Sequence, residues 1–267
     1  MAEFSNPEAY ELWMGRWSDR LAPAFVRFAG PPENGRVLDV GSGTGALAAA
    51  LLADVADATV VGIEPAEAYV AFSSARLRDE RLRFEIGDAL AIPFEDDGFD
   101  AALSLLILQE LPDAPRAVRE MRRVTRPGGR VAASQWDFAD GMPMLALFWD
   151  AVVEVVDSDA ARRAAADCMV VDHPDEGALR RLWQGAGLVG IVTERHEIAM
   201  DFTSFDDYRA PFLSGVTPTS SFAGGLDDDQ RAAVEDRLRQ STVGPGPDRA
   251  FSLPARAWAV RGAVPMG

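Results

Sequence analysis

The sequence predicts an α/β protein built on a mostly parallel sheet of seven strands, with helices on both faces of the sheet. Short apolar runs of strand length alternate with helix-like segments through the first half of the 267-residue chain. The first of these runs leads into a glycine-rich turn, and two longer strand-like runs lie near the C-terminus. Such alternation is typical of βαβ units, whose parallel strands are covered by helices on both sides.

The glycine-rich turn follows residues 37–40, an apolar run that contains one acid, Asp39, and suits a strand buried on both faces. Gly41, Gly43 and Gly45 then permit a sharp turn and the close approach of a ligand to the backbone. An Ala- and Leu-rich helix is expected directly after the turn, with its N-terminal amides facing the ligand. The segment predicts a nucleotide-type site, while the loose dinucleotide pattern of NAD-binding folds and a purely structural turn remain alternatives.

Acidic residues follow the next two predicted strands. Residues 59–63 form a second buried run that ends at Glu64, where a carboxylate can accept two hydrogen bonds from a ribose diol. Residues 82–86 predict a third strand, after which Asp88 can accept a hydrogen bond from the exocyclic amine of adenine. Either acid alone is also explained as a helix cap or a solvated loop residue. Together with Asp39 they place acids at three successive strand ends, which favours a nucleotide-type ligand.

The following residues complete the parallel part of the predicted sheet. Residues 100–106 predict a fourth strand, and apolar residues at three- and four-residue spacing predict a helix over 114–124. Gly128 and Gly129 are expected to end this helix and to lead into a fifth strand over 131–135. The first half of the chain thus supplies five strands in regular alternation with helices.

The second half follows a different pattern. Residues 141–168 carry long helical stretches, which we interpret as an inserted helical cover over the strand ends. A helix over 176–186 and strands over 189–200 and 251–261 are expected to follow. The insertion at 201–248 is rich in aromatic residues, Gly and Pro and is too long for a hairpin turn. It is expected to form either a lid or pocket, or a helix packed on the sheet edge.

Composition narrows the class of partner. A formal net charge of −16 and a pI near 4.5 argue against nucleic-acid and phospholipid substrates and against attraction to anionic membranes. Cys168 is the only cysteine, which excludes an internal disulfide, and with only two histidines no metal site is expected. The N-terminus lacks a basic region followed by an apolar stretch, so we expect a cytoplasmic protein with no membrane association.

In this order, the motifs resemble those of class I S-adenosylmethionine-dependent methyltransferases, in particular the small-molecule group similar to ubiquinone and menaquinone C-methyltransferases. Residues 37–45 resemble the first motif of that family, Glu64 its ribose-binding acid, and Asp88 its adenine-side motif. Residues 91–100 are similar to the family's Pro-Phe-acid approach to strand four, and residues 126–131 to its turn into strand five.

The resemblance implies a Rossmann-like sheet with an antiparallel last strand and a helical cover. It also implies S-adenosylmethionine as the cofactor and a small molecule as the methyl acceptor. The positions that it assigns to the cofactor are Tyr10, Arg16, Asp39, Gly41, Ser42, Gly43, Glu64, Pro65, Asp88, Ala89, Leu90 and Leu105. We expect a single domain over 1–267, which comprises an N-terminal helical lid (1–30), a cofactor-binding core (31–135), a helical insertion (136–175) and a C-terminal sheet half (176–267).

The aromatic N-terminal residues 10–18 resemble a leading helix that, in this family, closes over the cofactor. The resemblance then implies that Tyr10 lies near the sulfonium and that Arg16 pairs with the methionine carboxylate, which a guanidinium matches bidentately. An amphipathic helix that buries Trp13 and Trp17 explains the tryptophans equally well.

The implied reaction is methyl transfer by in-line displacement, for which the sequence identifies no general base. His173, His196, Asp137 and Tyr208 are candidates, and each is also explained by a structural role. Residues 108–111, Leu-Gln-Glu-Leu, stand where many relatives carry a histidine, so family base assignments do not transfer. Two other functions remain open: a catalytically idle cofactor-binding regulatory protein and an NAD-type oxidoreductase. The acceptor and the oligomeric state are not indicated by the sequence.

Overall fold

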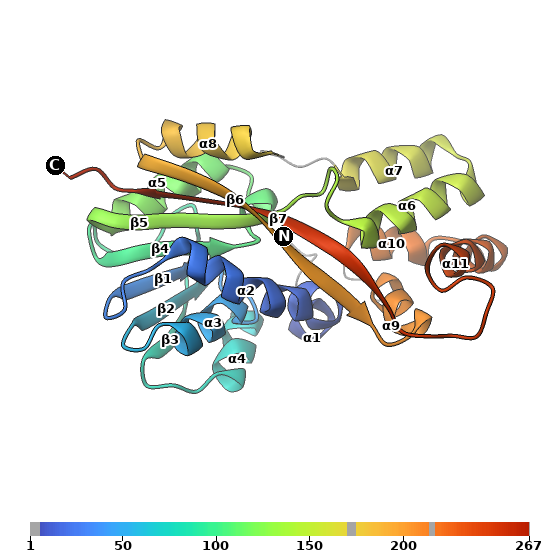
Figure 1. Cartoon of the computed structure of the whole chain (residues 1–267), viewed down its shortest axis with the longest axis horizontal. Helices are drawn as coiled ribbons and strands as arrows, with labels where there is room; N and C mark the ends of the chain where they lie inside the picture. Colours follow the sequence, from blue (N-terminus) through green and yellow to red (C-terminus); the bar gives the residue numbers. More distant parts are fainter. Residues whose placement is uncertain (1–5, 170–174, 214–216, 267) are drawn as a thin grey trace.

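The molecule is built around a sheet of seven strands (Figure 1). The strands are β1 (Arg36–Val40), β2 (Thr59–Glu64), β3 (Leu82–Ile86), β4 (Phe99–Leu105), β5 (Thr125–Trp136), β6 (Val189–Phe202) and β7 (Phe251–Ala263). This computed structural model describes residues 6–169, 175–213 and 217–266. The strand order is β3-β2-β1-β4-β5-β7-β6. Strands β1 to β5 run parallel, and β7 pairs antiparallel with both β5 and β6, which confirms the predicted fold class.

Helices cover both faces of this sheet. In the first part of the chain they are α1 (Pro7–Tyr10), the π-helix η1 (Glu11–Gly15), α2 (Arg16–Ala29), α3 (Ala46–Asp54), α4 (Glu67–Arg76), the 3₁₀-helix η2 (Leu108–Glu110) and α5 (Ala114–Val124). The remainder are α6 (Pro143–Val156), α7 (Asp159–Met169), α8 (Glu176–Gly185), α9 (Phe205–Arg209), the 3₁₀-helix η3 (Ala210–Leu213), α10 (Pro218–Gly224) and α11 (Asp228–Thr242). Helices α2 and α3 lie on one face, and α5 and α8 lie on the other (Figure 1). None of the helices in the described ranges combines the length and apolar character that crossing a bilayer requires.

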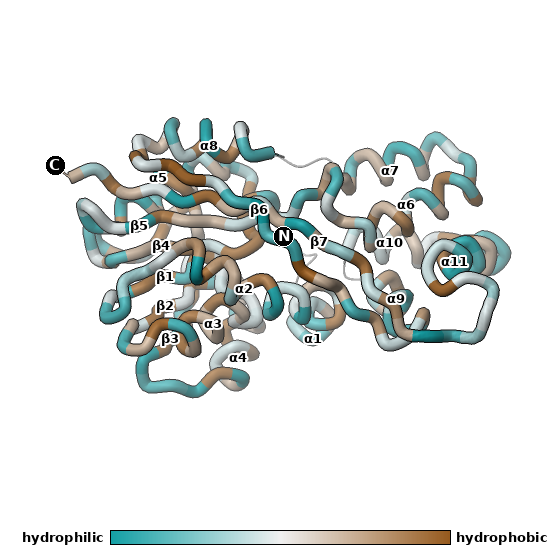
Figure 2. The backbone as a smooth tube through the Cα atoms, in the orientation of Figure 1, coloured by the Kyte–Doolittle hydropathy of each residue, from teal (hydrophilic) through white to brown (hydrophobic). Residues whose placement is uncertain are grey.

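Each central strand buries side chains on both faces. Val37 of β1 packs in the core beneath α2 and α3, whereas its neighbour Leu38 packs in the core beneath α5 and α8. Successive side chains of a strand point to opposite faces, so two separate cores require a nearly continuous apolar run. Figure 2 shows such apolar segments along the central strands. The strand order reverses between β1 and β4, and open α/β sheets bind ligands at the strand ends beside such a reversal.

The helical region formed by α6, α7, α9, α10 and α11 lies at the outer ends of β6 and β7 (Figure 1). The predicted helical cover is therefore present, as α6 and α7. The insertion between the last two strands, for which a lid or a packed helix was expected, consists largely of helices. Phe212 in this insertion stacks on Phe148 of α6 at 4.4 Å between ring centroids and meets Trp13 edge-on at 5.4 Å. Aromatic packing thus joins the insertion to both the helical cover and the N-terminal segment.

Several strand boundaries differ from those predicted, and two of these differences have a clear physical reason. Strand β5 begins at Thr125 rather than at residue 131, because the predicted glycine turn is absorbed as an irregularity in its pairing with β4. Gly128 at this point has a φ of +74°, a conformation that glycine adopts without strain. Strand β4 ends at Leu105, one residue sooner than predicted, because Leu106 has a φ of +66° and cannot continue a strand. Positive φ at a bulky residue is unusual, and such strain clusters near functional sites.

Candidate cofactor site

The glycine turn between β1 and α3 is pinned to the end of β2. The amides of Gly41 and Ser42 both donate to the carbonyl oxygen of Ile63, each at 2.9 Å. A Cβ added at Gly41 would lie 2.6 Å from Ile107, so this position admits no side chain. At Gly43, whose φ is +51°, an added Cβ would meet nothing within 4 Å. The turn is therefore packed on one side and open above Gly43, where a ligand can approach the backbone.

Asp39, near the end of β1, is a fully buried carboxyl group, with 0% of its surface exposed. Neither of its oxygens makes a hydrogen bond to another described residue. Burial raises its pKa to about 8; the nearby amide of Ala48 offsets part of that rise without making a well-aligned hydrogen bond. Leaving a buried acceptor unsatisfied costs about 1–3 kcal/mol, and such groups in native structures call for an explanation. An unpaired acid beside an open glycine turn fits a polar or cationic ligand group.

Glu64, at the end of β2, is held by two backbone amides. Its Oε2 accepts from the amide of Gly43 at 3.3 Å, and its Oε1 accepts from the amide of Ala66 at 3.2 Å. Burial raises the pKa of Glu64, and these two hydrogen bonds oppose the rise. Each oxygen keeps a further lone pair, so the carboxylate is oriented and can still accept from a diol. Pro65 follows at an exposed position.

The residues predicted to hold the adenine side lie on the loop after β3. Asp88 is exposed, and its Oδ1 accepts from the amide of Leu90 at 2.8 Å, which closes a local turn. Ala89 is buried, and Leu90 is half-buried. Leu105 is buried at the end of β4. These residues occupy the strand ends that the sequence pattern indicated, although the turn occupies one oxygen of Asp88.

Tyr10 lies beside this site. Its ring meets that of Tyr69 edge-on, with 6.0 Å between the centroids. Burial raises the pKa of Tyr10 to about 12, a hydrogen bond with Ser18 lowers it, and the nearby charges of Glu110, Glu11 and Glu64 raise it further. The predicted place of Tyr10 near the sulfonium of the cofactor stays a prediction.

Arg16 is held by the insertion between the last two strands. Its Nη1 donates to Oδ1 of Asp207 at 2.7 Å, and its Nη2 donates to the carbonyl oxygen of the same residue at 3.4 Å. The guanidinium also lies 4.3 Å from the centroid of the Trp17 ring. Asp207 thus competes with a cofactor carboxylate for this arginine, and the predicted role of Arg16 at the cofactor stays a prediction.

Three further side chains near the site were missed by the sequence analysis. Tyr69 of α4 is buried at 4% exposure, and its hydroxyl has no hydrogen-bond partner among the described residues. The Oε1 of Gln109, in the short helix after β4, is buried and likewise without a partner there. Arg76, at the end of α4, donates to the carbonyl oxygen of Thr44 in the glycine turn. The sequence signal for Tyr69 was its place in the helix that directly follows the β2 acid.

The candidate bases occupy structural positions where the structure describes them. Asp137 accepts from the amide of Asp140, and its Oδ2 lies 3.5 Å from the Arg256 guanidinium. His196 is buried on β6 with its Nε2 3.0 Å from Glu194. The Tyr208 hydroxyl donates to the carbonyl oxygen of Met144 at 2.9 Å, and burial raises its pKa well above the usual value. His173 lies outside the described residues.

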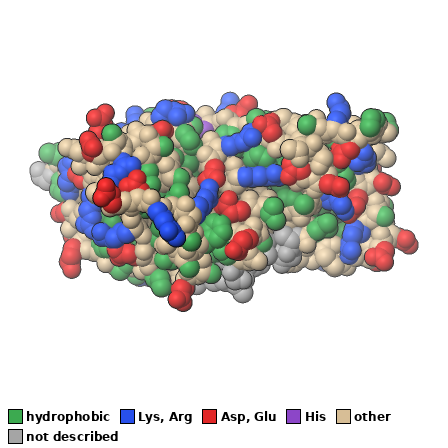
Figure 3. Space-filling model, turned by 90° about the horizontal axis from the view of Figure 1, so that it is seen from below, with side chains coloured by type: hydrophobic (Ala, Val, Ile, Leu, Met, Phe, Trp, Pro, Cys, Tyr) green, Lys and Arg blue, Asp and Glu red, His purple; other side chains and the backbone are tan. Residues whose placement is uncertain are grey.

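The charge pattern on the face seen in Figure 3 is mixed rather than basic. Figure 3, which views the molecule from below, shows Arg side chains interspersed with Asp and Glu rather than gathered into one positive patch. A nucleic-acid backbone is usually bound by a continuous basic surface, which this face does not present. Within the described ranges, no three His, Cys, Asp or Glu side chains converge to hold a metal ion.

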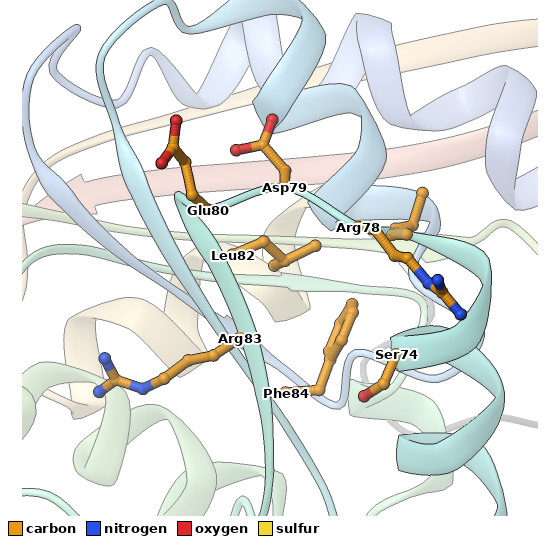
Figure 4. A pocket seen from close by; sticks show the side chains of 8 residues that line it. Ser74, Arg78, Asp79, Glu80, Leu82, Arg83 and Phe84 are labelled. Carbon is orange, nitrogen blue, oxygen red and sulfur yellow. The ribbon is translucent and has the colours of Figure 1, made fainter.

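The hollow in Figure 4 lies at the edge of the sheet formed by β3, and its lining residues Leu77 and Phe84 also pack against Gly45 of the glycine turn. It has a volume of about 410 Å³. It is lined by Ser74, Leu77, Arg78, Asp79, Glu80, Leu82, Arg83 and Phe84. The charged side chains labelled in this view splay away from one another, and the apolar lining is small (Figure 4). It therefore lacks the enclosing apolar wall and convergent polar groups of a small-molecule site.

The chain is similar to known methyltransferases. A family model described as a methyltransferase domain matches residues 38–133. The demethylmenaquinone methyltransferase of Roseiflexus sp. (strain RS-1) is 40% identical over 107 residues, which are 40% of this chain and 45% of that protein. The demethylmenaquinone methyltransferase of Beutenbergia cavernae is 32% identical over 187 residues, which are 63% of this chain and 76% of that protein. The chain thus spans less than half the length of the Roseiflexus relative and about three quarters of the second.

Among solved structures, phosphoethanolamine N-methyltransferase 2 of Haemonchus contortus, in complex with phosphomonomethylethanolamine and S-adenosylhomocysteine, has a similar fold. The TM-score is 0.59 at 16% sequence identity, and the match covers 97% of this chain and 57% of that one. At this level of identity the likeness concerns the fold alone.

The strand order, the glycine turn and the acids at the strand ends define a nucleotide-binding protein of the doubly wound α/β class. Within that class, the chain belongs to the class I S-adenosylmethionine-dependent methyltransferases. S-adenosylmethionine is the cofactor of this family, and its positively charged groups would favour the ionised form of the partnerless Asp39 carboxyl group, whose pKa burial raises to about 8.

Proposed function

We propose that this protein transfers a methyl group from S-adenosylmethionine to a small-molecule acceptor. The observation that carries the proposal is the fully buried, partnerless carboxylate of Asp39 beside the open backbone at Gly43 and the oriented carboxylate of Glu64. A cation with a ribose diol satisfies all three features, whereas a purely structural turn leaves the cost of burying Asp39 unexplained.

In this proposal, the cofactor binds across the ends of β1, β2 and β3. Glu64 accepts from the ribose hydroxyls, Asp88 and its two neighbours hold the adenine side, and Asp39 faces the methionine part. The proposed cofactor positions are Tyr10, Asp39, Gly41, Ser42, Gly43, Glu64, Pro65, Asp88, Ala89, Leu90 and Leu105. Arg16 stands apart from this set, because Asp207 already holds its guanidinium. We place the lid at residues 1–30, the cofactor core at 31–135, the helical insertion at 136–175 and the C-terminal sheet half at 176–267.

When bound, the cofactor supplies a methyl group made electrophilic by a positively charged sulfur. The chain's own contribution is positioning and exclusion of water, which together account for much of the rate gain in displacement reactions. The backbone of the glycine turn and Glu64 fix the nucleoside, while the N-terminal segment with Tyr10 covers the site. No side chain among the described residues is assigned as a general base.

A small molecule is the acceptor class that the relatives and the charge support. The Roseiflexus and Beutenbergia relatives are named as demethylmenaquinone methyltransferases, so we propose a quinone-type or similarly apolar acceptor. The net charge of −16 disfavours a nucleic-acid acceptor. The exposed Leu12 and Leu213 lie on η1 and η3, two elements in contact, and they give this side of the molecule apolar surface.

An acceptor screen with methyl-labelled S-adenosylmethionine tests the proposal. We expect label to enter one product class, with one S-adenosylhomocysteine released per methyl transferred. The same assay with the Glu64→Ala variant controls for a contaminating enzyme and is expected to lose most of the signal. Cofactor binding without product across quinones, phenols and amines would instead support an idle cofactor-binding protein and contradict the proposed transfer.

A further inference from the structure

One face of α4 holds the N-terminal segment, which we define as residues 6–20. Tyr69 and Arg76 are two turns apart on α4, so their side chains share one face of that helix. Helix α1 lies against α4 (Figure 1). The contacts made by these two side chains connect the segment to the candidate cofactor site.

Arg76 joins the N-terminal segment to the glycine turn. Its Nη1 donates to Oε1 of Glu11 and to the carbonyl oxygen of Thr44, both at 3.2 Å. Its Nη2 donates to Oδ2 of Asp19 at 2.5 Å. The side chains of all three charged partners are half-buried, so solvent screens these pairs less than exposed ones. One guanidinium therefore bridges two points of the segment and the backbone of the turn.

The carboxylate of Glu11 lies directly over Gly15 in the π-helix η1. A Cβ added at Gly15 would collide with this carboxylate and would displace it. Single-turn π-helical segments are rare and are often found at functional sites. The Glu-Leu-Trp-Met-Gly stretch thus directs an acid toward α4 rather than into solvent.

Tyr69 supplies an unused hydroxyl beneath the same segment. The side chain is 4% exposed, its hydroxyl has no partner among the described residues, and its ring meets the Tyr10 ring edge-on. Burial raises the pKa of Tyr69, and so do the negative charge of Glu64 and the neighbouring Tyr10. The hydroxyl therefore stays protonated and, having no partner among the described residues, can donate a hydrogen bond to a bound ligand.

We infer that Tyr69 and Arg76 form a clasp on α4 that holds the N-terminal segment closed over the bound cofactor, with the Tyr69 hydroxyl as a cofactor-binding group. Arg76 is a positioning residue, since it acts through Glu11, Asp19 and the turn rather than on the ligand. This inference rests on the proposed cofactor site. It adds that opening of the clasp limits the rate at which the cofactor dissociates. The clasp must open before the cofactor leaves, so its loss accelerates dissociation.

Dissociation of S-adenosylmethionine from the full chain, followed by stopped-flow tryptophan fluorescence, tests the clasp. For Arg76→Met we expect the dissociation rate to rise about tenfold, the effect of losing one or two charge-assisted hydrogen bonds, with little change in the association rate. Arg76→Lys keeps one ion pair and is expected to restore part of the effect. Tyr69→Phe removes only the hydroxyl and is expected to raise the dissociation rate about fivefold.

Two further variants separate the clasp from a general loss of stability. Arg27→Met removes the ion pair between Arg27 of α2 and Asp54 of α3, which lies outside residues 6–20. This variant is expected to leave the dissociation rate unchanged. The double variant Glu11→Gln, Asp19→Asn keeps Arg76 but removes its partners, and is expected to match Arg76→Met. Hydrogen exchange of residues 6–20 should slow when the cofactor binds wild type, and slow less in Arg76→Met.

Wild-type dissociation rates in both Arg76→Met and Tyr69→Phe would overturn the clasp while leaving the proposed function intact, because wild type would still bind the cofactor. The same increase in Arg27→Met would also overturn it, since the effect would then be one of general stability. A wild-type protein that does not bind S-adenosylmethionine would refute the proposed function itself.

Discussion

The parallel half of the sheet (β1 to β5) and the outer region, formed by the N-terminal segment and the helices at the ends of β6 and β7, hold their acids differently. In the parallel half, the carboxyl group of Asp39 is buried without a partner among the described residues. In the outer region, Asp207 is paired with Arg16. Unpartnered buried donors occur in the outer region too, for example the indole N–H of Trp149, so it is the unpaired acid that distinguishes the parallel half as the region arranged to receive a ligand.

The largest effect is expected in the parallel half, at the open backbone of Gly43. Gly43→Arg fills the space above the turn, so we expect S-adenosylmethionine affinity to fall at least about 100-fold in a calorimetric titration. Gly190→Arg is the matched control, because Gly190 also has positive φ and open space but lies on β6. In both variants a non-glycine residue at positive φ costs about 1–2 kcal/mol of folding free energy. Equal cofactor affinities in the two variants would show that the glycine turn does not bind the cofactor.

Asp39→Asn tests whether the buried acid of Asp39 makes the free energy of unfolding depend on pH. The pKa of Asp39 is raised to about 8 from a usual value of 3.8, so between these pH values the folded state binds a proton that the unfolded state has lost. Stability of the ligand-free wild type therefore falls as pH rises through this window. Between pH 5 and pH 8 we expect wild type to lose about 2–4 kcal/mol of unfolding free energy relative to Asp39→Asn, measured by urea unfolding. Parallel stability curves for the two proteins would contradict this.

Glu64→Ala removes the carboxylate that the two backbone amides orient. We expect S-adenosylmethionine and S-adenosylhomocysteine to lose similar affinity, about 1.5–3 kcal/mol each, because both carry the same ribose. Glu67→Ala, an exposed acid three residues further on, is the matched control and should bind normally. Loss of affinity for only one of the two ligands would contradict the assignment of Glu64 to the ribose.

The smallest effect is expected in the outer region, at the ion pair between Arg16 and Asp207. Both side chains are partly exposed, at 30% and 25%, so their coupling in a double-mutant cycle should be about 0.5–1 kcal/mol of unfolding free energy. Arg16→Met is expected to change cofactor affinity less than about threefold, in line with Asp207→Asn. A tenfold loss in Arg16→Met alone would assign Arg16 to the cofactor carboxylate, as the resemblance implied.

The parallel half could be predicted because its signals are local. The run from Val37 to Val40, the alternating glycines and the acid at Glu64 each identify a strand, a turn or a strand end within a few residues. The remaining features depend on contacts between distant parts of the chain. Arg16 and Asp207 are 191 positions apart, and nothing near either residue indicates the other.

The same reason explains the boundaries and residues that were missed. The start of β5 is set by its pairing with β4, which the local Pro-Gly-Gly signal did not reveal. Tyr69 looks like an ordinary apolar helix residue until its hydroxyl is found buried without a partner. The helical nature of the insertion after β6 is decided by its packing on α6 and β6, so the sequence left a lid and a packed helix equally open.

The central claim is that the glycine turn and the strand-end acids hold S-adenosylmethionine. Side-by-side calorimetric titration of the full chain with S-adenosylmethionine, S-adenosylhomocysteine and NAD tests it most directly. We expect both sulfur-containing ligands to bind with micromolar affinity, corresponding to about −8 kcal/mol, and NAD not to bind. Binding of NAD alone, or of none of the three, would contradict the account.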